Sequence, residues 1–304
     1  MRVVVALGGN ARETAGGGGG DLTDTAVQMA ELVAEGHEVV ITHGNGPQVG
    51  ELLLDQEARG PQRHARLPLD VLVAMTQAQL GYRLQLAIED ELVAHDDHTD
   101  VVTVITEVIV DVDDPAFHEP TKPIGPKLAE HPDDGRAYAR TSDGRWRLLV
   151  SSPEPVHIVE HAALRAIIED GIVPICAGGG GVPVVRDGAR LRGVEAVIDK
   201  DLASALVAAT VDADVLLILT DVPFVELDHG TPEARPLTEL TVADAAALRT
   251  HFGAGSMGPK VRAAARAASE GRVAVIAGLG DALGALRGVA GTRVVADDDA
   301  EVLR

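Results

Sequence analysis

The sequence predicts an α/β protein in which a mainly parallel central sheet is covered by helices on both faces. Short runs of Val, Ile and Leu alternate along the chain with longer Ala-rich stretches that have a helical pattern. Most of the short runs end in Gly, Asn or Asp. Uninterrupted apolar strands are typical of parallel sheets buried on both faces, and regular strand–helix alternation is typical of the same architecture.

Six runs of branched aliphatic residues are the expected strands, in order along the chain: RVVVAL (2–7), EVVITH (38–43), VVTVIT (101–106), IVPICA (172–177), VLLILT (215–220) and RVAVIA (272–277). Six helical patterns lie between or after them, at 23–35, 68–94, 157–170, 201–210, 241–251 and 259–270. Each strand is short enough to cross one sheet, and the intervening helices are long enough to return the chain to the same edge.

Residues 111–152, called the inserted segment below, break this alternation. They are rich in Pro, Asp, Gly and Arg, and they show no clear helical pattern. A connection of this length is uncommon in a compact domain unless it has a structure or function of its own. We therefore expect a small protruding subdomain, or lid.

Composition excludes several classes of protein. The chain of 304 residues has a net charge of −21, which would repel nucleic acid. Its single cysteine, Cys176, excludes a disulfide framework and favours a reducing, cytoplasmic environment. No apolar run approaches the roughly 18 residues of a membrane span. The acidic composition fits either a salt-adapted protein or a bias of codon usage and solubility, and the sequence leaves both open.

Glycine-rich turns follow three of the expected strands: GGN (8–10), HGNGPQVG (43–50) and GGGG (178–181). Ligands of parallel sheets bind beyond the carboxyl ends of the strands. Glycine lets backbone N–H groups approach an anion closely, and helix N-termini add a favourable dipole. Three such turns at strand ends predict a site for an anion or phosphate.

The familiar catalytic motifs are missing. No Gly-Lys pair exists, so a Walker A loop is excluded, and HGNGPQVG spaces its glycines as GxGxxxG instead of GxGxxG. The protein-kinase signatures and the GxSxG elbow of hydrolases are also absent. The His and Cys residues lack metal-ligand spacing, and His43 is expected to be a packed histidine.

Lysine is rare in this chain: only four of the 26 Lys and Arg residues are lysines. Lys122, Lys200 and Lys260 each lie in a short motif bounded by Gly, Pro or Asp, whereas Lys127 is expected at the surface. A phosphoryl group in transfer spreads charge over its oxygens, and positioned cations stabilise it. Asp199 and Asp201 flank Lys200 and could orient it, help to hold a metal, or cap the following helix.

Together these motifs resemble the carbamate kinases of the amino acid kinase superfamily. The resemblance is carried, in family order from residue 6 to 261, by ALGGNA, THGNGPQVG, PLD with VAMTQ, PTKPIGP, GGGGVPVV, GVEAVIDKDLAS, LTDV and GSMGPKV. It implies a homodimer whose subunit is an open αβα sandwich. It also implies that 1–212, including the inserted segment, bind carbamate or carbamoyl phosphate, and that 213–304 bind the nucleotide.

The implied reaction is reversible phosphoryl transfer between ATP and carbamate, with ADP and carbamoyl phosphate on the other side. Mg²⁺ would be held mainly through the phosphates, and the family makes ATP in fermentative arginine breakdown. The implied catalytic residues are Lys122, Lys200, Asp201 and Lys260, with Asp201 orienting the lysines. The implied substrate-binding residues are Gly8, Gly9, Asn10, Gly44, Asn45, Gly46, Gly178 and Gly179. The implied nucleotide site contains Asp221, Ser256, Met257 and again Lys260.

Two departures and two alternatives accompany this resemblance. The segment after GGNA is shorter and richer in glycine than is usual, and Pro223 replaces the usual polar residue after LTDV. One alternative is another kinase of the superfamily that phosphorylates a small carboxylate. The second is a non-catalytic ligand-binding homologue, which the presence of all three motif lysines disfavours.

Overall fold

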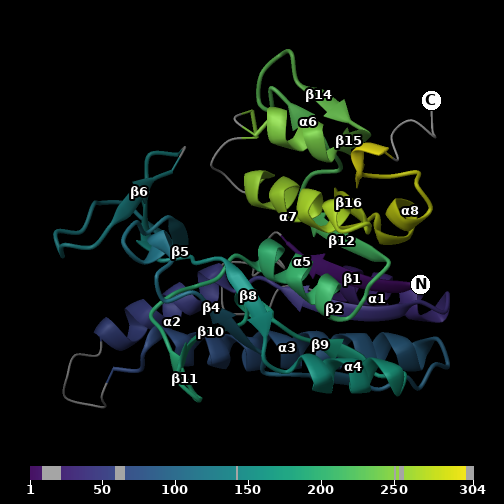
Figure 1. Ribbon diagram of the computed structural model, residues 1–304, viewed down its shortest axis with the longest axis horizontal. Coiled ribbons are helices and arrows are strands. Elements are labelled where there is room, and N and C mark those ends of the chain that lie inside the picture. Colours follow the sequence, from purple (N-terminus) through teal and green to yellow (C-terminus); the bar gives the residue numbers. More distant parts are fainter. Residues whose placement is uncertain (9–21, 59–65, 142, 250, 253–256, 299–304) are drawn as a thin grey trace.

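The computed structural model describes residues 1–8, 22–58, 66–141, 143–249, 251–252 and 257–298. Within these residues the centre of the molecule is an eight-stranded sheet in the order β15-β17-β16-β12-β1-β2-β9-β3 (Figure 1). All six expected strand segments lie in this sheet, as β1 (Arg2–Leu7), β2 (Glu38–His43), β3 (Val101–Thr103), β9 (Val173–Ile175), β12 (Val215–Thr220) and β16 (Val273–Gly278). Every neighbouring pair among these six is parallel. β17 (Thr292–Val295), antiparallel to β16, and then the edge strand β15 (Glu239–Thr241) complete the sheet beyond β16, and β3 forms the opposite edge.

Helices cover both faces of this sheet, because side chains of each strand point alternately to one face and the other. On β1, Val4 and Ala6 pack into one apolar core, and Val3 and Val5 into the core on the opposite face. The first core contains side chains of α4 (His161–Glu169), α5 (Lys200–Thr210), α6 (Val242–Ala247) and α7 (Met257–Ser269). The second contains side chains of α1 (Thr23–Ala34), α3 (Leu69–Ala94) and α8 (Ala282–Leu286). The predicted αβα sandwich is confirmed.

Several element boundaries differ from the prediction. The helix expected at 157–170 begins only at His161, because β8 (Pro155–Ile158) pairs antiparallel with β4 (Glu107–Val110). The helix expected at 259–270 begins at Met257, so Lys260 lies in its first turn. A further helix, α2 (Gly46–Ala58), occupies a stretch where no helix was predicted.

A second sheet has the strand order β11-β10-β4-β8, where β10 is Val182–Asp187 and β11 is Arg190–Gly193. The inserted segment leaves this sheet after β4 and returns at β8. It forms a three-stranded sheet of its own, in the order β5-β7-β6, from β5 (Lys122–Leu128), β6 (Tyr138–Arg140) and β7 (Trp146–Val150), after the short helix η1 (Pro115–Phe117). Figure 1 shows β5 and β6 projecting to one side of the main sheet.

The base of the inserted segment is part of an apolar core, not a free appendage. Ile124 and Leu148 are buried with Val49 and Leu53 of α2 and with side chains of α3 and β10. A small hairpin, β13 (Val225–Leu227) with β14 (Arg235–Leu237), lies beside the other end of the sheet. None of the helices among the described residues is long and apolar enough to cross a membrane.

Candidate active site

The glycine turns meet at one edge of the sheet because the strands before them are neighbours. β12, β1, β2 and β9 are adjacent and parallel, so their carboxyl ends lie together. Gly8, Gly44 and Asp221 directly follow three of these ends. Gly9, Asn10 and Ser256, which the resemblance also implies, lie outside the described residues.

Lys200 is the first residue of α5, and its side chain passes between the first two glycine turns. A Cβ atom on Gly8 would lie 2.9 Å from the Lys200 Nζ, and one on Gly44 would lie 3.3 Å from its Cδ. Gly8 also donates its backbone N–H to the Leu219 carbonyl of β12 at 2.7 Å. Any side chain at Gly8 or Gly44 would therefore displace the ammonium group from the strand ends.

Asp201 joins two of the lysines. Its Oδ1 accepts a hydrogen bond from Lys200 Nζ at 2.7 Å, and its Oδ2 accepts one from Lys260 Nζ at 3.1 Å. The Asp201 side chain is only 3% exposed and that of Lys260 only 6%. Burial lowers the pKa of Lys200, and the nearby Asp201 carboxylate opposes that shift. The arrangement gathers two cations around one anion and leaves a net positive charge for a ligand.

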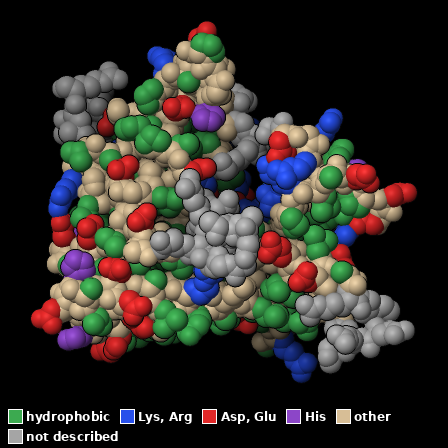
Figure 2. All heavy atoms as spheres, turned by 180° about the vertical axis from the view of Figure 1, so that it is seen from behind, with side chains coloured by type: hydrophobic (Ala, Val, Ile, Leu, Met, Phe, Trp, Pro, Cys, Tyr) green, Lys and Arg blue, Asp and Glu red, His purple; other side chains and the backbone are tan. Residues whose placement is uncertain are grey.

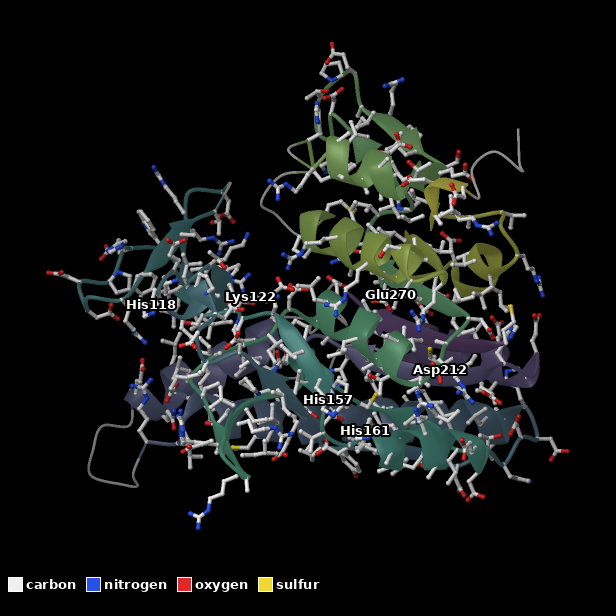
Figure 3. The ribbon with its side chains drawn as sticks, viewed as in Figure 1. His118, Lys122, His157, His161, Asp212 and Glu270 are labelled. Carbon is white, nitrogen blue, oxygen red and sulfur yellow. The ribbon has the colours of Figure 1, made fainter. Side chains whose placement is uncertain are left out.

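Asp199 holds the third lysine. Its Oδ1 accepts hydrogen bonds from the backbone N–H groups of Asp201 and Leu202, so it is the N-cap of α5. Its Oδ2 accepts a hydrogen bond from Lys122 Nζ at 2.5 Å. Burial would raise the pKa of Asp199, but the charge and hydrogen bond of Lys122 hold that pKa below its ordinary value. Figure 3 shows Lys122 on the side of the inserted segment that faces the main body.

These contacts show which of the three lysines each aspartate binds. Asp201 does contact the lysines, as expected, but Asp199 is more than a helix cap because it also pairs with Lys122. Lys127, the fourth lysine, pairs instead with Asp143 within the inserted segment, at 2.8 Å and with 41% of its side chain exposed. The three motif lysines thus converge on two neighbouring aspartates, and the fourth lies apart.

The remaining glycines of the expected site pack beneath the second turn. Gly179 has φ = +66°, and a Cβ atom there would overlap the side chain of Asn45. A Cβ atom on Gly178 would overlap the His43 ring, and both glycines are buried. Gly46 begins α2, so the N-terminus of that helix lies at the same strand ends. Gly178 and Gly179 therefore shape the turn through their close approach to Asn45 and His43.

A buried polar network that the sequence reasoning missed supports this edge. Asn45 Nδ2 donates to Thr76 Oγ1 at 2.8 Å. Gln77 Nε2 donates to the Thr106 carbonyl at 3.1 Å, and Gln77 Oε1 accepts from the Thr106 N–H at 3.0 Å. Thr106 Oγ1 in turn accepts from the N–H of Ala177, which has φ = +47°. The available signal was a pair of adjacent polar residues, Thr76 and Gln77, on an otherwise apolar face of a long helix.

His43 and Cys176 do not have the environment of catalytic bases or nucleophiles. Burial lowers the pKa of His43 to about 4, and its Nδ1 lies 3.1 Å from the Gly44 carbonyl. The ring is therefore neutral and packed, as expected. Burial raises the pKa of the Cys176 thiol to about 12, so the reactive thiolate is not formed near neutral pH.

The expected nucleotide residues lie around β12 and the start of α7. Asp221 is exposed directly after β12 and accepts a hydrogen bond from Thr220 Oγ1 at 3.1 Å. Met257 begins α7 and packs partly against the first core, one turn before Lys260. Pro223 lies against the end of β16, where a Cβ atom on Gly278 would be 3.6 Å from the Pro223 Cα.

The described residues contain no cluster of three or more His, Cys, Asp or Glu that could hold a metal ion. Asp199 and Asp201 are committed to lysines in this structure. Acidic side chains are instead scattered over the surface, as the face in Figure 2 shows.

Comparison with known proteins gives a consistent result. The amino acid kinase family matches residues 1–278. The carbamate kinase of Pyrococcus horikoshii is 45% identical over 96% of this chain and 98% of its own length. The carbamate kinase of Giardia lamblia bound to citric acid has a TM-score of 0.90 at 37% identity, and its complex with AMP-PNP has a TM-score of 0.86 at 38%; each match covers 97% of this chain and 98% of the other. The resemblance drawn from the motifs is confirmed, and the chain belongs to the carbamate kinases of the amino acid kinase family.

Proposed function

We propose that this protein is an ATP-dependent phosphotransferase that catalyses reversible phosphoryl transfer between ATP and carbamate. The observation that carries the proposal is the convergence of Lys122, Lys200 and Lys260 on Asp199 and Asp201 at the carboxyl ends of parallel strands. An anion that enters this edge meets three ammonium groups, backbone N–H groups of glycine turns and a helix N-terminus. The similarity to carbamate kinases supports carbamate as the acceptor.

In the proposed reaction, a carbamate oxygen attacks the γ-phosphorus of ATP, and the bond from that phosphorus to the ADP oxygen breaks. The reverse reaction returns the phosphoryl group from carbamoyl phosphate to ADP. Lys200 and Lys260 neutralise charge on the transferred oxygens while Asp201 holds both lysines in place. Because carbamate is already an anionic nucleophile, positioning and charge neutralisation suffice, and no general base is required.

Lys122 contributes a third cation from the inserted segment, which acts as the lid. Its present partner is Asp199, from which Lys122 would turn to the phosphoryl group when substrate is bound. The turns at Gly8 and Gly44–Gly46 cradle the acceptor, and Gly178 with Gly179 supports Asn45 from below. The residues Gly9 and Asn10 belong to the same proposed turn.

The proposed nucleotide site is the carboxyl end of β12 together with the start of α7. Asp221, Met257 and Lys260 lie on these elements, and Ser256 directly precedes Met257 in the chain. We propose in addition the division into an acceptor part (1–212) and a nucleotide part (213–304). The AMP-PNP complex of the Giardia lamblia relative supports an adenine nucleotide as the donor. Bound Mg²⁺ would supply charge neutralisation on the phosphates.

A direct assay tests this function. Purified protein with ADP, Mg²⁺ and carbamoyl phosphate should form ATP, detected by luminescence. Lys200→Arg should lower kcat by about 10²-fold, because the larger, planar guanidinium group of arginine cannot replace the compact ammonium group between Gly8 and Gly44. Lys127→Ala is the matched control and should leave kcat unchanged, since the exposed Lys127 pairs with Asp143 within the inserted segment.

The same assay separates the alternatives. Folded protein that forms no ATP from carbamoyl phosphate but phosphorylates N-acetylglutamate would indicate another kinase of the family. Folded protein that binds ADP without turnover would indicate a non-catalytic homologue. Unchanged activity in Lys200→Arg would contradict the role proposed for that ammonium group.

We further propose that the reaction runs in the cytoplasm towards ATP during arginine breakdown. The family supports this setting, and the buried, protonated thiol of Cys176 is compatible with a reducing compartment. A coupled reaction can test the direction. An enzyme that splits citrulline with phosphate to release carbamoyl phosphate should drive net ATP formation in the presence of this protein and ADP.

We also propose that two copies associate through α3. Five apolar side chains of this helix are exposed at spacings of four and seven residues, which places them on one stripe: Val71, Met75, Tyr82, Leu86 and Val93. An apolar stripe of this length on a surface helix is typical of an interface. Light scattering should give a dimer mass for the wild-type protein and a monomer mass for Leu86→Lys; a monomeric wild type would contradict the proposal.

A further inference from the structure

Two glycines from different motifs lie in direct contact where the inserted segment meets the main body. Gly50 ends the motif HGNGPQVG and lies in α2, and Gly125 lies in the motif PTKPIGP on β5. A Cβ atom on Gly50 would overlap the backbone nitrogen and Cα of Gly125, and one on Gly125 would lie 3.3 Å from the Cα of Gly50. Both glycines are buried. Backbone therefore packs on backbone here, without side chains between them.

This contact accounts for the unusual glycine spacing GxGxxxG. Gly46 and Gly50 are four residues apart, so they lie on the same face of α2. That face meets β5, because a Cβ atom on Gly46 would lie 3.9 Å from the Pro123 carbonyl oxygen. Lys122 directly precedes Pro123. α2, which begins at Gly46, thus runs alongside β5, which begins with Lys122.

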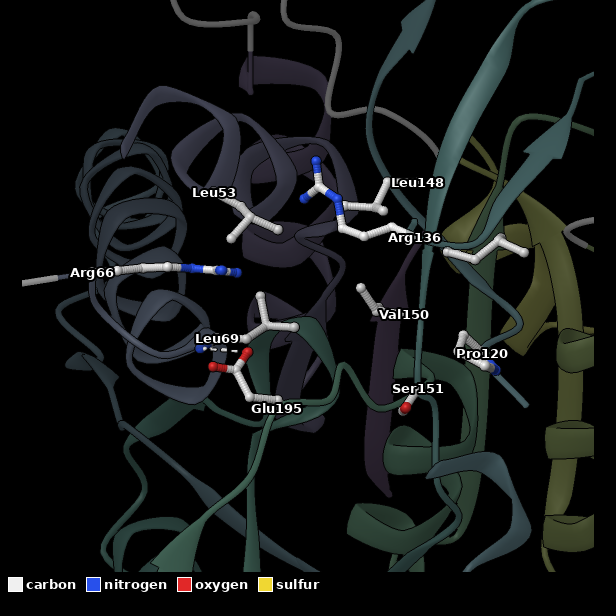
Figure 4. Close-up of a pocket in the computed structure, with 10 residues that line it drawn as sticks. Leu53, Arg66, Leu69, Pro120, Arg136, Leu148, Val150, Ser151 and Glu195 are labelled. Carbon is white, nitrogen blue, oxygen red and sulfur yellow. Dashed lines mark hydrogen bonds between the residues drawn. The ribbon is translucent and has the colours of Figure 1, made fainter. Parts of the chain in front are cut away.

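Two hydrogen-bonded contacts link α2 and β5 to other parts of the inserted segment. The Arg147 Nε on β7 donates to the Gly125 carbonyl of β5 at 3.1 Å. At the far end of α2, Arg136 Nη1 donates to both carboxylate oxygens of Glu57, at 3.0 and 3.1 Å. Between these points, Leu53 and Leu148 line a cavity of about 190 Å³ together with Arg136 (Figure 4).

We propose that Gly50 and Gly125 are positioning residues that set the location of Lys122 relative to the turn at Gly44–Gly46. Because α2 and β5 meet without intervening side chains, the inserted segment does not rotate freely about β4 and β8, the two strands that connect it to the second sheet. The contact between Gly50 and Gly125 fixes the start of β5, and Lys122 with it, at a set distance from the N-terminus of α2 at Gly46. The inference rests on the proposed role of Lys122 in phosphoryl transfer.

A double-mutant cycle in the full-length protein tests this coupling. Lys122→Ala should lower kcat by about 10²-fold. Gly50→Ala should also lower kcat by about 10²-fold, because a displacement near 1 Å of a catalytic group has an effect of that size. If Gly50 acts through Lys122, Gly50→Ala should lower kcat by less than about threefold in the Lys122→Ala background. A purely structural effect would multiply in both backgrounds.

Gly81→Ala is the matched control. Its added Cβ would overlap the side chain of Thr103, so it perturbs packing between α3 and β3, away from β5. It should lower the unfolding temperature but change kcat of the folded protein by less than about twofold. If Gly50→Ala does not fold, the cycle is made with Gly125→Ala, whose φ of +70° disfavours a side chain but whose added atom is less crowded.

The outcomes are distinct. A loss in Gly50→Ala that is absent in the Lys122→Ala background supports the inference. Equal losses in both backgrounds, or an unchanged kcat in Gly50→Ala, overturn it and leave the proposed function intact. An unchanged kcat in Lys122→Ala overturns the proposed role of that lysine and the inference together.

Discussion

At the scale of single residues, the charge balance of the site depends on Asp199 and Asp201, which pair with the three motif lysines. Asp201 is nearly closed to solvent and accepts hydrogen bonds from two ammonium groups. A buried ion pair contributes little when intact, because desolvation offsets the attraction between the charges. Removing one partner is costly, because the other charge stays buried without compensation. The stability of this edge is therefore most sensitive at Asp201.

Asp201→Asn is expected to destabilise the fold by about 3–5 kcal/mol and to lower kcat by about 10²-fold or more, because the buried carboxylate that accepts hydrogen bonds from both Lys200 and Lys260 loses its charge. Urea unfolding and the ATP assay measure the two effects. Asp143→Asn is the control, since Asp143 pairs with the exposed Lys127, and it should change neither quantity appreciably. Wild-type stability in Asp201→Asn would show that the carboxylate is not the balancing charge.

His43 predicts a dependence of stability on pH. Below pH 6.5 the unfolded chain protonates this imidazole, while the buried ring stays neutral until the pH approaches 4. The unfolded state therefore gains protons first, and the free energy of unfolding falls as pH falls, by about 3 kcal/mol at pH 4 from this residue alone.

His43→Gln should remove this part of the acid sensitivity. Wild-type protein and variant are compared by urea unfolding at several values between pH 7 and pH 4. The stability lost on acidification should be smaller in the variant by about 3 kcal/mol. Curves that run parallel for the two proteins would mean that the ring already takes up its proton in the folded state.

Residue-level reasoning from the sequence succeeded where an unusual residue type was itself the signal. Lysine is so rare in this chain that its positions pointed to the three residues that now lie on Asp199 and Asp201. The pairing of Lys122 with Asp199 could not be predicted, because the two are 77 residues apart and meet only through the fold. The network through Thr76 and Gln77 stayed hidden for the same reason.

At the scale of elements, α5 combines a structural task with a chemical one in its first turn. Asp199 caps the helix with one carboxylate oxygen and binds Lys122 with the other. The cap fixes the direction of the first turn, and that turn carries Lys200 and Asp201. Helix geometry thus places the lysines before any ligand arrives.

Substitutions at Asp199 can separate these tasks. Asp199→Asn keeps a side-chain oxygen for the cap but loses the charge, whereas Asp199→Ala loses both. The alanine variant should therefore be less stable than the asparagine variant by about 1 kcal/mol, while both alter kcat and KM alike through the freed Lys122. Unfolding curves and steady-state kinetics measure this pair. Equal stability of the two variants would contradict the role of Asp199 as a cap.

Elements were predictable where the apolar pattern was long and regular. All six predicted strands are present in the main sheet, although β3 and β9 have three residues each where six were predicted, and most helices begin close to their expected limits. α2 was missed because its sequence, GPQVGELLLDQEA, begins with Gly and Pro and has glycine inside its first two turns. Gly50 lowers the local preference for helix by about 1 kcal/mol, and its presence is explained only by the contact with Gly125. α4 begins later than predicted because the residues before it form β8, whose partner β4 is too distant in the sequence for a local pattern to reveal the pairing.

At the scale of the whole molecule, the net charge of −21 contrasts with a site that gathers three lysines. Repulsion among surface carboxylates destabilises the compact state, and salt screens it over a Debye length of about 3 Å at 1 M. The strand-end lysines are mostly buried and are screened less.

The unfolding temperature should therefore rise as NaCl is increased from low to molar concentration, measured by circular dichroism. The same series in KCl should give a similar curve, because screening depends on ionic strength. Activity that stays high at molar salt would support salt adaptation. A monotonic fall of activity with salt would favour codon usage and solubility as the origin of the acidic composition.

The way the inserted segment joins the body has a consequence for the history of such enzymes. It begins after Val110 and ends before Pro155, and these two residues are register partners on the antiparallel strands β4 and β8. An ancestral hairpin turn at this position could have been lengthened with its ends already held together, and the entropy of closing a longer loop grows only slowly. Exchange of this one segment would leave the eight-stranded sheet and the lysines of α5 and α7 in place. Replacing this hairpin tip would therefore change the cation that Lys122 supplies, while Lys200, Lys260 and Asp201 would be inherited unchanged.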